Sequence, residues 1–337
     1  MKKQTWASIA RDSAEKAHKT EVDSLKAKLA QYAQTVSDLD KQLGIALTLG
    51  KAKVKPRAME VPMQDKADAV AVALLSDVHA EEEVTKTSVN GLNEYSLAIA
   101  EERMAKFFRT TARLTEIERG GAKIDTLILW LGGDLFSGMI HEELMETSKK
   151  TPTQMILWLQ ERLMDGIATL KPHFEKILIP TSYGNHGRTT KKPRHATGAA
   201  HSYEWLMYKI LEGRYASDSQ VEWQVADSYF NYVNVFDKTL RFHHGDNLRY
   251  NGGIGDISVS VNKAIASWNK GANRADLDIF GHWHRYQQSS NWLCNGSVIG
   301  YNAFALSIKA PADEAPTQTF FLYDKKRGRT VTAPILL

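Results

Sequence analysis

The chain has 337 residues, 43% of them hydrophobic and 24% charged, and its formal net charge is +4 at pH 7. This length and apolar content allow one large α/β domain or two ordinary ones, and they exclude a disordered chain. The one cysteine, Cys294, excludes intramolecular disulfides and thiolate metal sites. Because no apolar stretch is long and uncharged enough to cross a bilayer, we expect a soluble cytoplasmic protein with no membrane partner.

The first 48 residues carry a heptad pattern. Apolar residues alternate at spacings of three and four: Val22, Leu25, Leu29, Tyr32, Val36, Leu39 and Leu43. This stripe predicts a coiled-coil-like helix over residues 22–43 that joins a second copy or a partner protein. The alternative is an amphipathic helix folded back on its own catalytic domain. Residues 49–68, polar and containing two prolines, are expected to form a linker.

From residue 69 to residue 337 we expect a single catalytic domain. The first part predicts strands at 69–75, 124–131 and 177–181, and helices at 95–119, 151–170 and 199–211. This alternation is typical of βαβ units with a parallel sheet. The second part predicts one helix at 257–268 and short strands at 229–236, 240–244, 277–281, 292–306 and 319–323. These short strands indicate a second, more antiparallel sheet.

Five short motifs follow the expected strands. They are Asp77-Val78-His79, Gly133-Asp134, Gly184-Asn185-His186, His243-His244-Gly245 and Gly281-His282-Trp283-His284. The carboxyl ends of strands collect ligands and catalytic groups in α/β sheets, so we expect the motifs to converge on one pocket. Carboxylate, amide and imidazole donors together are typical of a two-metal hydrolytic centre.

In order and residue type, these motifs resemble the pattern of the calcineurin-like metallophosphoesterase superfamily, from about residue 69 to the C-terminus. The resemblance implies an α/β fold, a four-layer αββα sandwich with two central sheets flanked by helices and a dinuclear site at one end. It implies that one metal is held by Asp77, His79, Asp134 and His284. It implies that the second is held by Asp134, Asn185, His244 and His282, with Asp134 as the bridge.

The mixed oxygen and nitrogen donors favour two manganese ions, with iron or zinc as alternatives, over magnesium. In the family, the histidine at the position of His186 contacts the substrate phosphate and helps the leaving oxygen depart; the alternative is that it only supports the site. His243 is expected to support His244 from behind, since the residue directly before glycine is the usual ligand.

Two departures from the family pattern bear on the substrate. Gly187 stands where an acidic residue commonly follows the Gly-Asn-His motif, which disfavours a protein phosphatase. Ser137 stands where the DNA-repair exonuclease branch, otherwise the nearest, has a histidine that protonates the leaving group. His141 is the nearest substitute, and we predict a catalytic role for it; alternatively, it is a surface or helix-capping histidine.

Basic residues follow the third motif: Arg188, Lys191, Lys192 and Arg194. Beside a phosphate-hydrolysing centre they predict a track for a nucleic-acid backbone, although a solvated loop would have the same composition. Arg249 and Tyr250 are expected to add a phosphate contact and a stacking face.

The sequence therefore predicts a phosphodiesterase or nuclease that hydrolyses nucleic acid, with DNA favoured. One alternative is a phosphomonoesterase that acts on nucleotides or other small phosphates. Another is a catalytically idle adaptor protein that assembles through its N-terminal helix.

Overall fold

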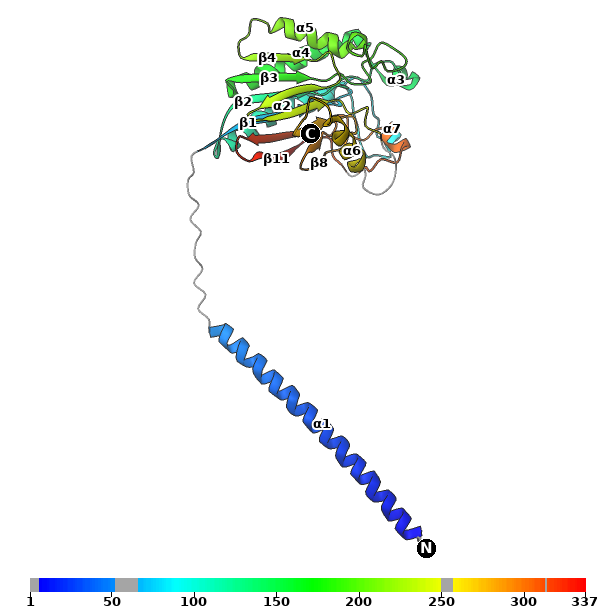
Figure 1. Ribbon diagram of the computed structural model, residues 1–337. Coiled ribbons are helices and arrows are strands. Elements are labelled where there is room, and N and C mark those ends of the chain that lie inside the picture. The colour runs from blue at the N-terminus through cyan, green and yellow to red at the C-terminus, as the bar shows by residue number, and fades with distance from the viewer. Residues whose placement is uncertain (1–5, 52–65, 250–256, 313) are drawn as a thin grey trace. The chain divides into compact units, whose positions relative to one another are not determined.

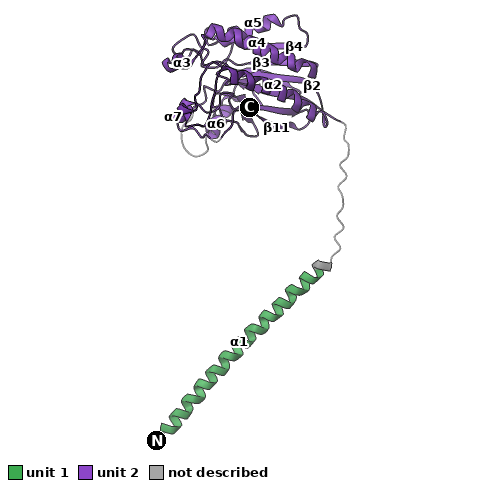
Figure 2. Cartoon of the chain, turned by 180° about the vertical axis from the view of Figure 1, so that it is seen from behind, with its two compact units in different colours: residues 1–64 green, residues 65–337 purple. Residues whose placement is uncertain are grey.

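The computed structural model describes residues 6–51, 66–249, 257–312 and 314–337. The chain divides into two units, residues 1–64 and residues 65–337 (Figure 2). Helix α1 (Trp6–Lys51) lies in the first unit, so the predicted N-terminal helix is present. Most of the predicted linker, residues 52–65, lies outside the described residues. Among the described helices, none combines the length and the apolar character needed to cross a membrane.

In the described part of the second unit, strands form two sheets. The first has the order β11-β10-β1-β2-β3-β4. Its strands are β1 (Ala67–Leu75), β2 (Ala122–Leu131), β3 (Lys176–Thr181), β4 (Val221–Val225), β10 (Thr317–Asp324) and β11 (Gly328–Leu336). Strands β1 to β4 are parallel, as the βαβ pattern predicts, while β10 pairs antiparallel with β1 and β11 antiparallel with β10.

The second sheet has the order β5-β6-β7-β9-β8. Its strands are β5 (Asn231–Val235), β6 (Lys238–His243), β7 (Leu277–Phe280), β8 (Gln287–Gln288) and β9 (Trp292–Cys294). The expectation of a more antiparallel sheet is only partly right. The central strands β6, β7 and β9 are parallel, and only the edge strands β5 and β8 run antiparallel to their neighbours.

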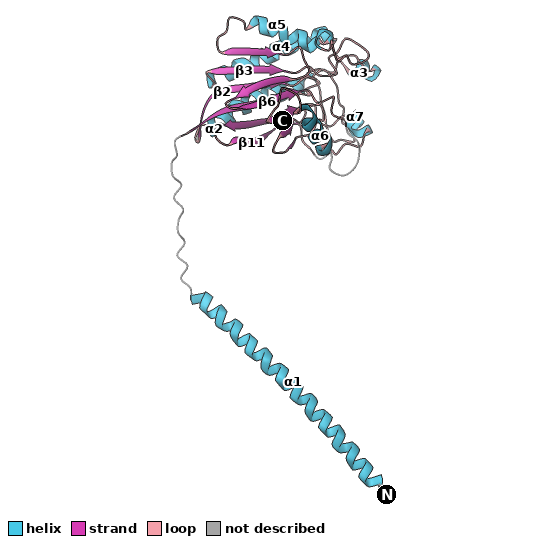
Figure 3. Cartoon of the chain, viewed as in Figure 1, coloured by secondary structure: helices cyan, strands magenta, loops and turns pink. Residues whose placement is uncertain are grey.

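Helices cover the outer faces of both sheets (Figures 1 and 3). They are α2 (Leu97–Glu118), α4 (Pro152–Leu170), α5 (Tyr203–Arg214) and α6 (Ser258–Trp268). The short helices α3 (Glu142–Thr147) and α7 (Ala303–Ser307) lie among the loops (Figure 1). Short 3-10 segments are η1 (Thr87–Val89), η2 (Lys171–His173) and η3 (Ala199–His201). Helix α4 begins with the predicted Thr151 cap, whose side chain accepts from the backbone N–H of Gln154. In turn, the Gln154 side chain accepts from the backbone N–H of Thr151, which completes a capping box.

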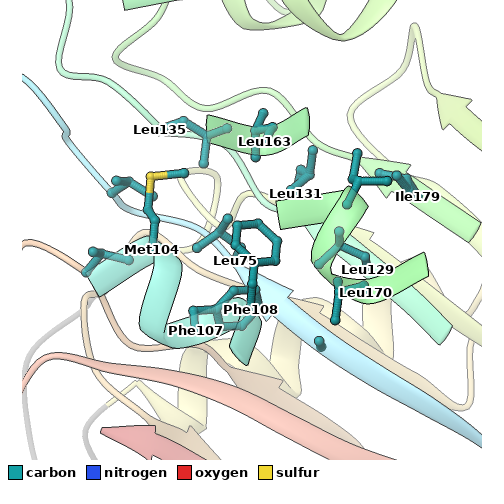
Figure 4. Close-up of a cluster of buried hydrophobic side chains, with 14 of the residues drawn as sticks. Leu75, Met104, Phe107, Phe108, Leu129, Leu131, Leu135, Leu163, Leu170 and Ile179 are labelled. Carbon is teal, nitrogen blue, oxygen red and sulfur yellow. The ribbon is translucent and has the colours of Figure 1, made fainter. Parts of the chain in front are cut away.

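Side-chain alternation along the strands sorts the core into layers. In β1, Ala73 and Leu75 pack with the helices, whereas Val72 and Leu74 pack with the second sheet. Buried side chains of α2, α4 and the first sheet interdigitate on the helix side (Figure 4). Helix α6 covers the far face of the second sheet, where Val261 lies in a cluster with residues of β7 and β9. The result is the predicted four-layer αββα arrangement.

The predicted strand over 292–306 is wrong beyond Cys294. Strand β9 ends there, and Asn302 caps the short helix α7 by accepting from the N–H of Ala305. The apolar residues between them are buried because this loop inserts behind the first motif: Val298 is inaccessible to solvent, and its N–H donates to the carbonyl of Asp77. Val298 and Ile299 are as buried as residues of a strand, but Gly296 and Gly300 flank them, as is typical of a loop.

Candidate metal centre

The strand order brings the five motifs to one edge of the sandwich. Asp77 follows β1, Asp134 follows β2 and Asn185 follows β3 in the first sheet. His244 follows β6, and His282 and His284 follow β7 in the second. Because these strands are parallel within each sheet, their carboxyl ends share an edge, where sheets of this class bind ligands.

Most of these residues have a backbone conformation that side-chain-bearing residues rarely adopt. The φ angle is positive at Asp77 (53°), His79 (48°), Asp134 (50°), His282 (71°) and His284 (55°). Such a conformation costs about 1–3 kcal/mol per residue and persists only where the surroundings enforce it. Here backbone bonds between the motifs enforce it: Asp77 N donates to Gly133 O at 3.0 Å, and His79 N to Asp134 O at 3.1 Å.

Asp77, His79 and His284 form the first cluster, with ligand atoms all within 4.8 Å of one another. The Nε2 atoms of the two histidines are 3.2 Å apart, and His284 Nε2 lies 3.5 Å from Asp77 Oδ1. Burial, together with the charges of His186 and His284, lowers the pKa of His79 well below its usual value. A neutral imidazole is the form that binds a metal ion.

Asp134, His244 and His282 form the second cluster, and their ligand atoms also lie within 4.8 Å of one another. His244 Nε2 lies 3.0 Å from Asp134 Oδ2 and 3.1 Å from Asn185 Oδ1. Burial opposes charge on His244, but the Asp134 carboxylate raises its pKa well above the usual value. Burial likewise opposes ionisation of Asp134, yet His244 holds the pKa of that carboxyl well below its usual range. The buried carboxylate thus requires a positive partner.

The donor set fits two divalent cations. Asp77 and Asp134 are almost completely buried, and burying carboxylates is costly unless cations or hydrogen bonds compensate them. Carboxylate oxygens and imidazole nitrogens converge from both sheets, in the proportions that manganese, iron and zinc accept. All seven predicted ligands lie at this edge, and Asn185 joins the second cluster through its contact with His244.

A buried polar network orients Asp77 from behind. Ser76 Oγ donates to Asp77 Oδ2 at 2.6 Å, and Asn295 Nδ2 donates to Ser76 Oγ at 2.9 Å. Gln318 Oε1 accepts from both Ser76 N and Asn295 Nδ2, and Thr319 Oγ1 donates to Asn295 Oδ1 at 2.8 Å. None of these groups was predicted from the sequence. Their signal was the run of polar residues in the otherwise apolar strand β10, which a buried strand carries only when they are satisfied.

Ser137 is fully buried and orients His79. Its Oγ lies 2.8 Å from His79 Nδ1 and donates to Glu82 Oε2 at 3.1 Å, while Asn302 Nδ2 donates to Glu82 Oε1 at 2.9 Å. When Ser137 donates to Glu82, its oxygen accepts the proton of His79 Nδ1. His79 Nε2 then carries the lone pair that faces the cluster.

The two adjacent histidines after β6 differ in role. His244 lies with its Nδ1 2.8 Å from Gly132 O, which leaves Nε2 for the second cluster. His243 points away from both clusters: its ring stacks on Phe280 at 5.3 Å and its Nε2 lies 3.7 Å from Asp278. Burial lowers the pKa of His243 against the opposing effect of Asp278.

His186 and His141 lie beside the first cluster. The backbone N–H of His186 donates to Asp134 Oδ1 at 2.8 Å, and its ring centroid is 4.9 Å from that of His79. His141 is exposed, and its ring centroid is 6.1 Å from that of His186. It precedes α3, but its side chain makes no capping hydrogen bond. Burial, followed by the charge of His186, lowers its pKa.

The basic loop divides into one anchored residue and three exposed ones. The Arg188 guanidinium donates to the carbonyls of Asn185, Thr190 and Lys191, so it holds the shape of the loop that carries Asn185. The side chains of Lys191, Lys192 and Arg194 are exposed to solvent. Arg249 is also exposed, whereas Tyr250 lies outside the described residues.

Two buried acids at the site were not found from the sequence. Glu81 accepts from the N–H groups of Ser137 and Gly138, and burial raises its pKa to about 7. Glu204, on α5, accepts from Leu135 N and Gly184 N, both at 2.7 Å. Burial, and then the charge of Asp134, raises its pKa to about 8.

No family model and no curated protein matches the sequence. Several solved structures are similar at low identity. Zinc-bound Vps29 from Entamoeba histolytica is 11% identical, with 78% of this chain and 97% of that chain covered and a TM-score of 0.31. A predicted phosphoesterase from Streptococcus pneumoniae is 10% identical, with 82% of this chain and 98% of that chain covered and a TM-score of 0.30. A dimetal phosphatase from Danio rerio is 10% identical, with 81% of this chain and 99% of that chain covered and a TM-score of 0.32. Likeness this low carries no argument about function, which rests on the geometry of the site.

Proposed function

We propose that the protein is a two-metal-dependent phosphoesterase of the calcineurin-like type, and that it acts as a phosphodiesterase or nuclease on nucleic acid. The observation that carries this proposal is the pair of ligand clusters, Asp77–His79–His284 and Asp134–His244–His282, side by side at one sheet edge. Their ordered motifs and the four-layer sandwich around them match the resemblance stated from the sequence.

Bound divalent cations would supply a water molecule of lowered pKa and neutralise the phosphate oxygens under attack. Asp77, His79 and His284 would hold one cation and Asp134, His244 and His282 the other, and the Asp134 carboxylate would contribute to both sites. His186 lies beside the first cluster, and its Nδ1 donates to the carbonyl of Ser137 at 3.1 Å. With the ring in its imidazolium form, Nε2 would donate to a phosphate oxygen. His141, 6.1 Å away between ring centroids, is proposed to protonate the leaving oxygen.

We propose manganese as the physiological metal, with iron or zinc as alternatives. The donors are nitrogen-rich, because imidazoles outnumber carboxylates in the two clusters together. Magnesium prefers oxygen donors and retains its water molecules, so it suits this set less well.

The proposal of a nucleic-acid substrate, DNA above RNA, is supported by the exposed cations that follow the third motif. Lys191, Lys192 and Arg194 lie within ten residues of Asn185 and present their charges to solvent. Such charges attract a phosphate backbone through release of its counterions. A compact monoester makes no use of an extended row of cations, so these charges favour a polymer.

One panel of substrates tests the function. The protein is loaded with manganese and assayed on single- and double-stranded DNA, RNA, bis(p-nitrophenyl) phosphate and p-nitrophenyl phosphate, beside the His79→Ala variant. We expect hydrolysis of DNA and of the chromogenic diester, and its loss in the variant. Turnover of the monoester alone would instead establish a phosphomonoesterase. Binding of manganese without any hydrolysis would point to an adaptor that assembles through its N-terminal helix.

A further inference from the structure

Helix α1 presents an apolar stripe that nothing within its own unit covers. The exposed fractions are 58% at Leu25, 72% at Leu29, 67% at Tyr32 and 57% at Val36, Leu39 and Leu43. Isolated helices depend on packing of their apolar face for most of their stability. A stripe of this length therefore indicates a partner.

We infer that α1 forms a parallel, in-register, two-stranded coiled coil with α1 of a second copy of the chain. With Val22, Leu29, Val36 and Leu43 at the a positions, the d positions hold Leu25, Tyr32 and Leu39. β-Branched residues at a, combined with leucine at d, favour two parallel strands over larger assemblies. The valines alternate with leucines at a, and two of the three d positions are leucine.

The residues that flank the stripe favour a second copy as the occupant. In a parallel pair, each g residue faces the e residue five positions later on the partner. Glu21 at g then faces Lys26 at e, and twofold symmetry makes this ion pair twice. The remaining pairs are Lys28 with Ala33, Thr35 with Asp40 and Gln42 with Leu47, so no like charges oppose one another.

Mass and cross-linking measurements on the full chain test this inference. Light scattering should give twice the chain mass of 37.8 kDa. A Leu25→Cys variant should form a disulfide-linked dimer with oxidised glutathione, because equivalent d residues meet only in the parallel register. The matched control is Lys41→Cys, on the outer face of the same helix, which should not cross-link; the native Cys294 is buried.

Charge exchange then tests the pairing. Glu21→Lys should weaken the dimer, and the double variant Glu21→Lys with Lys26→Glu should restore it, while manganese-dependent hydrolysis is unchanged in both. A monomeric mass, or absence of the cross-link at position 25, would overturn the inference. A dimer that cross-links between Leu25→Cys and Val36→Cys chains, but not within either population, would show an antiparallel pair, in which a residues meet d residues, and would also overturn it.

A separate observation concerns Gly187 and Glu204. Gly187 does not have a positive φ, so its backbone does not exclude a side chain. A Cβ there would lie 2.9 Å from Cγ of Glu204 and 3.3 Å from Phe136 Cζ. The Glu204 side chain therefore occupies the space into which a residue at position 187 would point.

We propose that Glu204 is a positioning residue that supplies, from helix α5, the acidic group that the motif lacks at position 187. Its two oxygens accept from Leu135 N and Gly184 N, one in each of the loops that carry Asp134 and Asn185. This carboxyl group thereby ties together the two loops that carry ligands of the second cluster. This proposal rests on the proposed metal centre but not on the nature of the substrate.

Manganese titration by calorimetry tests the role of Glu204 without an activity readout. In Glu204→Gln the amide presents a donor where one backbone N–H needs an acceptor, so affinity should fall about 10–100-fold, as for other groups that orient ligands. Gly187→Glu combined with Glu204→Gly should recover most of that loss. Unchanged affinity in Glu204→Gln, or no recovery in the folded double variant, would overturn the proposal.

A double-mutant cycle that adds one methyl group at position 187 keeps the test informative if a charge variant misfolds. Gly187→Ala should lower the Tm in the native background and be tolerated beside Glu204→Ala, because the obstructing side chain is then absent. Equal effects in both backgrounds would show that the two residues do not share this space. Manganese binding by the native chain without hydrolysis would contradict the proposed function and leave the role of Glu204 intact.

Discussion

The metal-binding edge and the basic loop are neighbours in the chain, yet they are built in different ways. Asp77, His79 and His244 are buried, and each is held from behind by Ser76, Ser137 or the carbonyl of Gly132. Six residues beyond Asn185, from Lys191 onward, the cations of the loop are exposed to solvent. The ligand geometry is therefore set before any substrate arrives, whereas the charges proposed to bind substrate are held only by their loop.

The largest effect on activity is expected at Asp134, where a substitution should destroy the buried metal-binding edge itself. Asp134→Asn removes the proposed bridging carboxylate and its pairing with His244. Metal catalysis contributes several kcal/mol, so loss of the centre should lower kcat by at least about 1,000-fold. Manganese titration and steady-state hydrolysis of bis(p-nitrophenyl) phosphate measure this. Retention of full activity and of two bound ions would contradict the assignment.

The next effect separates the two histidines beside the first cluster. If His141 protonates the leaving oxygen, His141→Gln should slow DNA hydrolysis about 100-fold, because general acids contribute in that range. It should hardly affect bis(p-nitrophenyl) phosphate, since nitrophenolate departs without a proton. His186→Gln is the matched comparison and should slow both substrates, as expected of a phosphate contact. Equal sensitivity of both substrates to His141→Gln would argue against the acid role.

A smaller effect on metal affinity is expected at Ser137, because its substitution should loosen one ligand, His79, and leave the others in place. Ser137→Ala removes the group that accepts from His79 Nδ1 and leaves Glu82 without one donor. Groups that orient ligands are worth about 10–100-fold in metal affinity or activity. Ser137→Thr keeps the hydroxyl and should retain more affinity than Ser137→Ala if the backbone accommodates its methyl group. Calorimetry with manganese decides the ranking, and identical affinity in all three proteins would show that the bond does not orient His79.

The smallest effect on chemistry should come from the loop itself. Reversing Lys191, Lys192 and Arg194 to glutamate should leave bis(p-nitrophenyl) phosphate turnover within about twofold, since these side chains are not at the metal ligands. DNA binding should weaken, and its logarithmic dependence on salt should become shallower by about 0.7–0.9 for each lost phosphate contact. Binding measured across a salt series checks this. A parallel loss on the small diester would assign the loop a direct part in catalysis or folding.

Much of the sandwich could be predicted from periodicity. The strands β1, β2 and β3 are buried apolar runs, and Thr151 and Pro152 are typical residues for the start of a helix, which is where α4 begins. The pairing of β6, β7 and β9 could not be predicted, because such short strands carry no signal for parallel or antiparallel partners. Residues 295–302 were wrongly predicted as strand, because Val298 and Ile299 in the loop behind Asp77 are as buried as strand residues, although Gly296 and Gly300 flank them.

The residues that could bind metal can be recognised without a fold. Ligands follow strand ends, and a motif of adjacent residues is readable without a fold, so the metal-binding set and its order were visible at once. The groups that hold those ligands in place come from segments far apart in the chain. Asn295 reaches Ser76 across 219 positions, Asn302 reaches Glu82 across 220, and Glu204 ties two loops from a helix of its own. Contacts between such distant segments leave no spacing in a single sequence, because they arise only when the sheets and helices pack together.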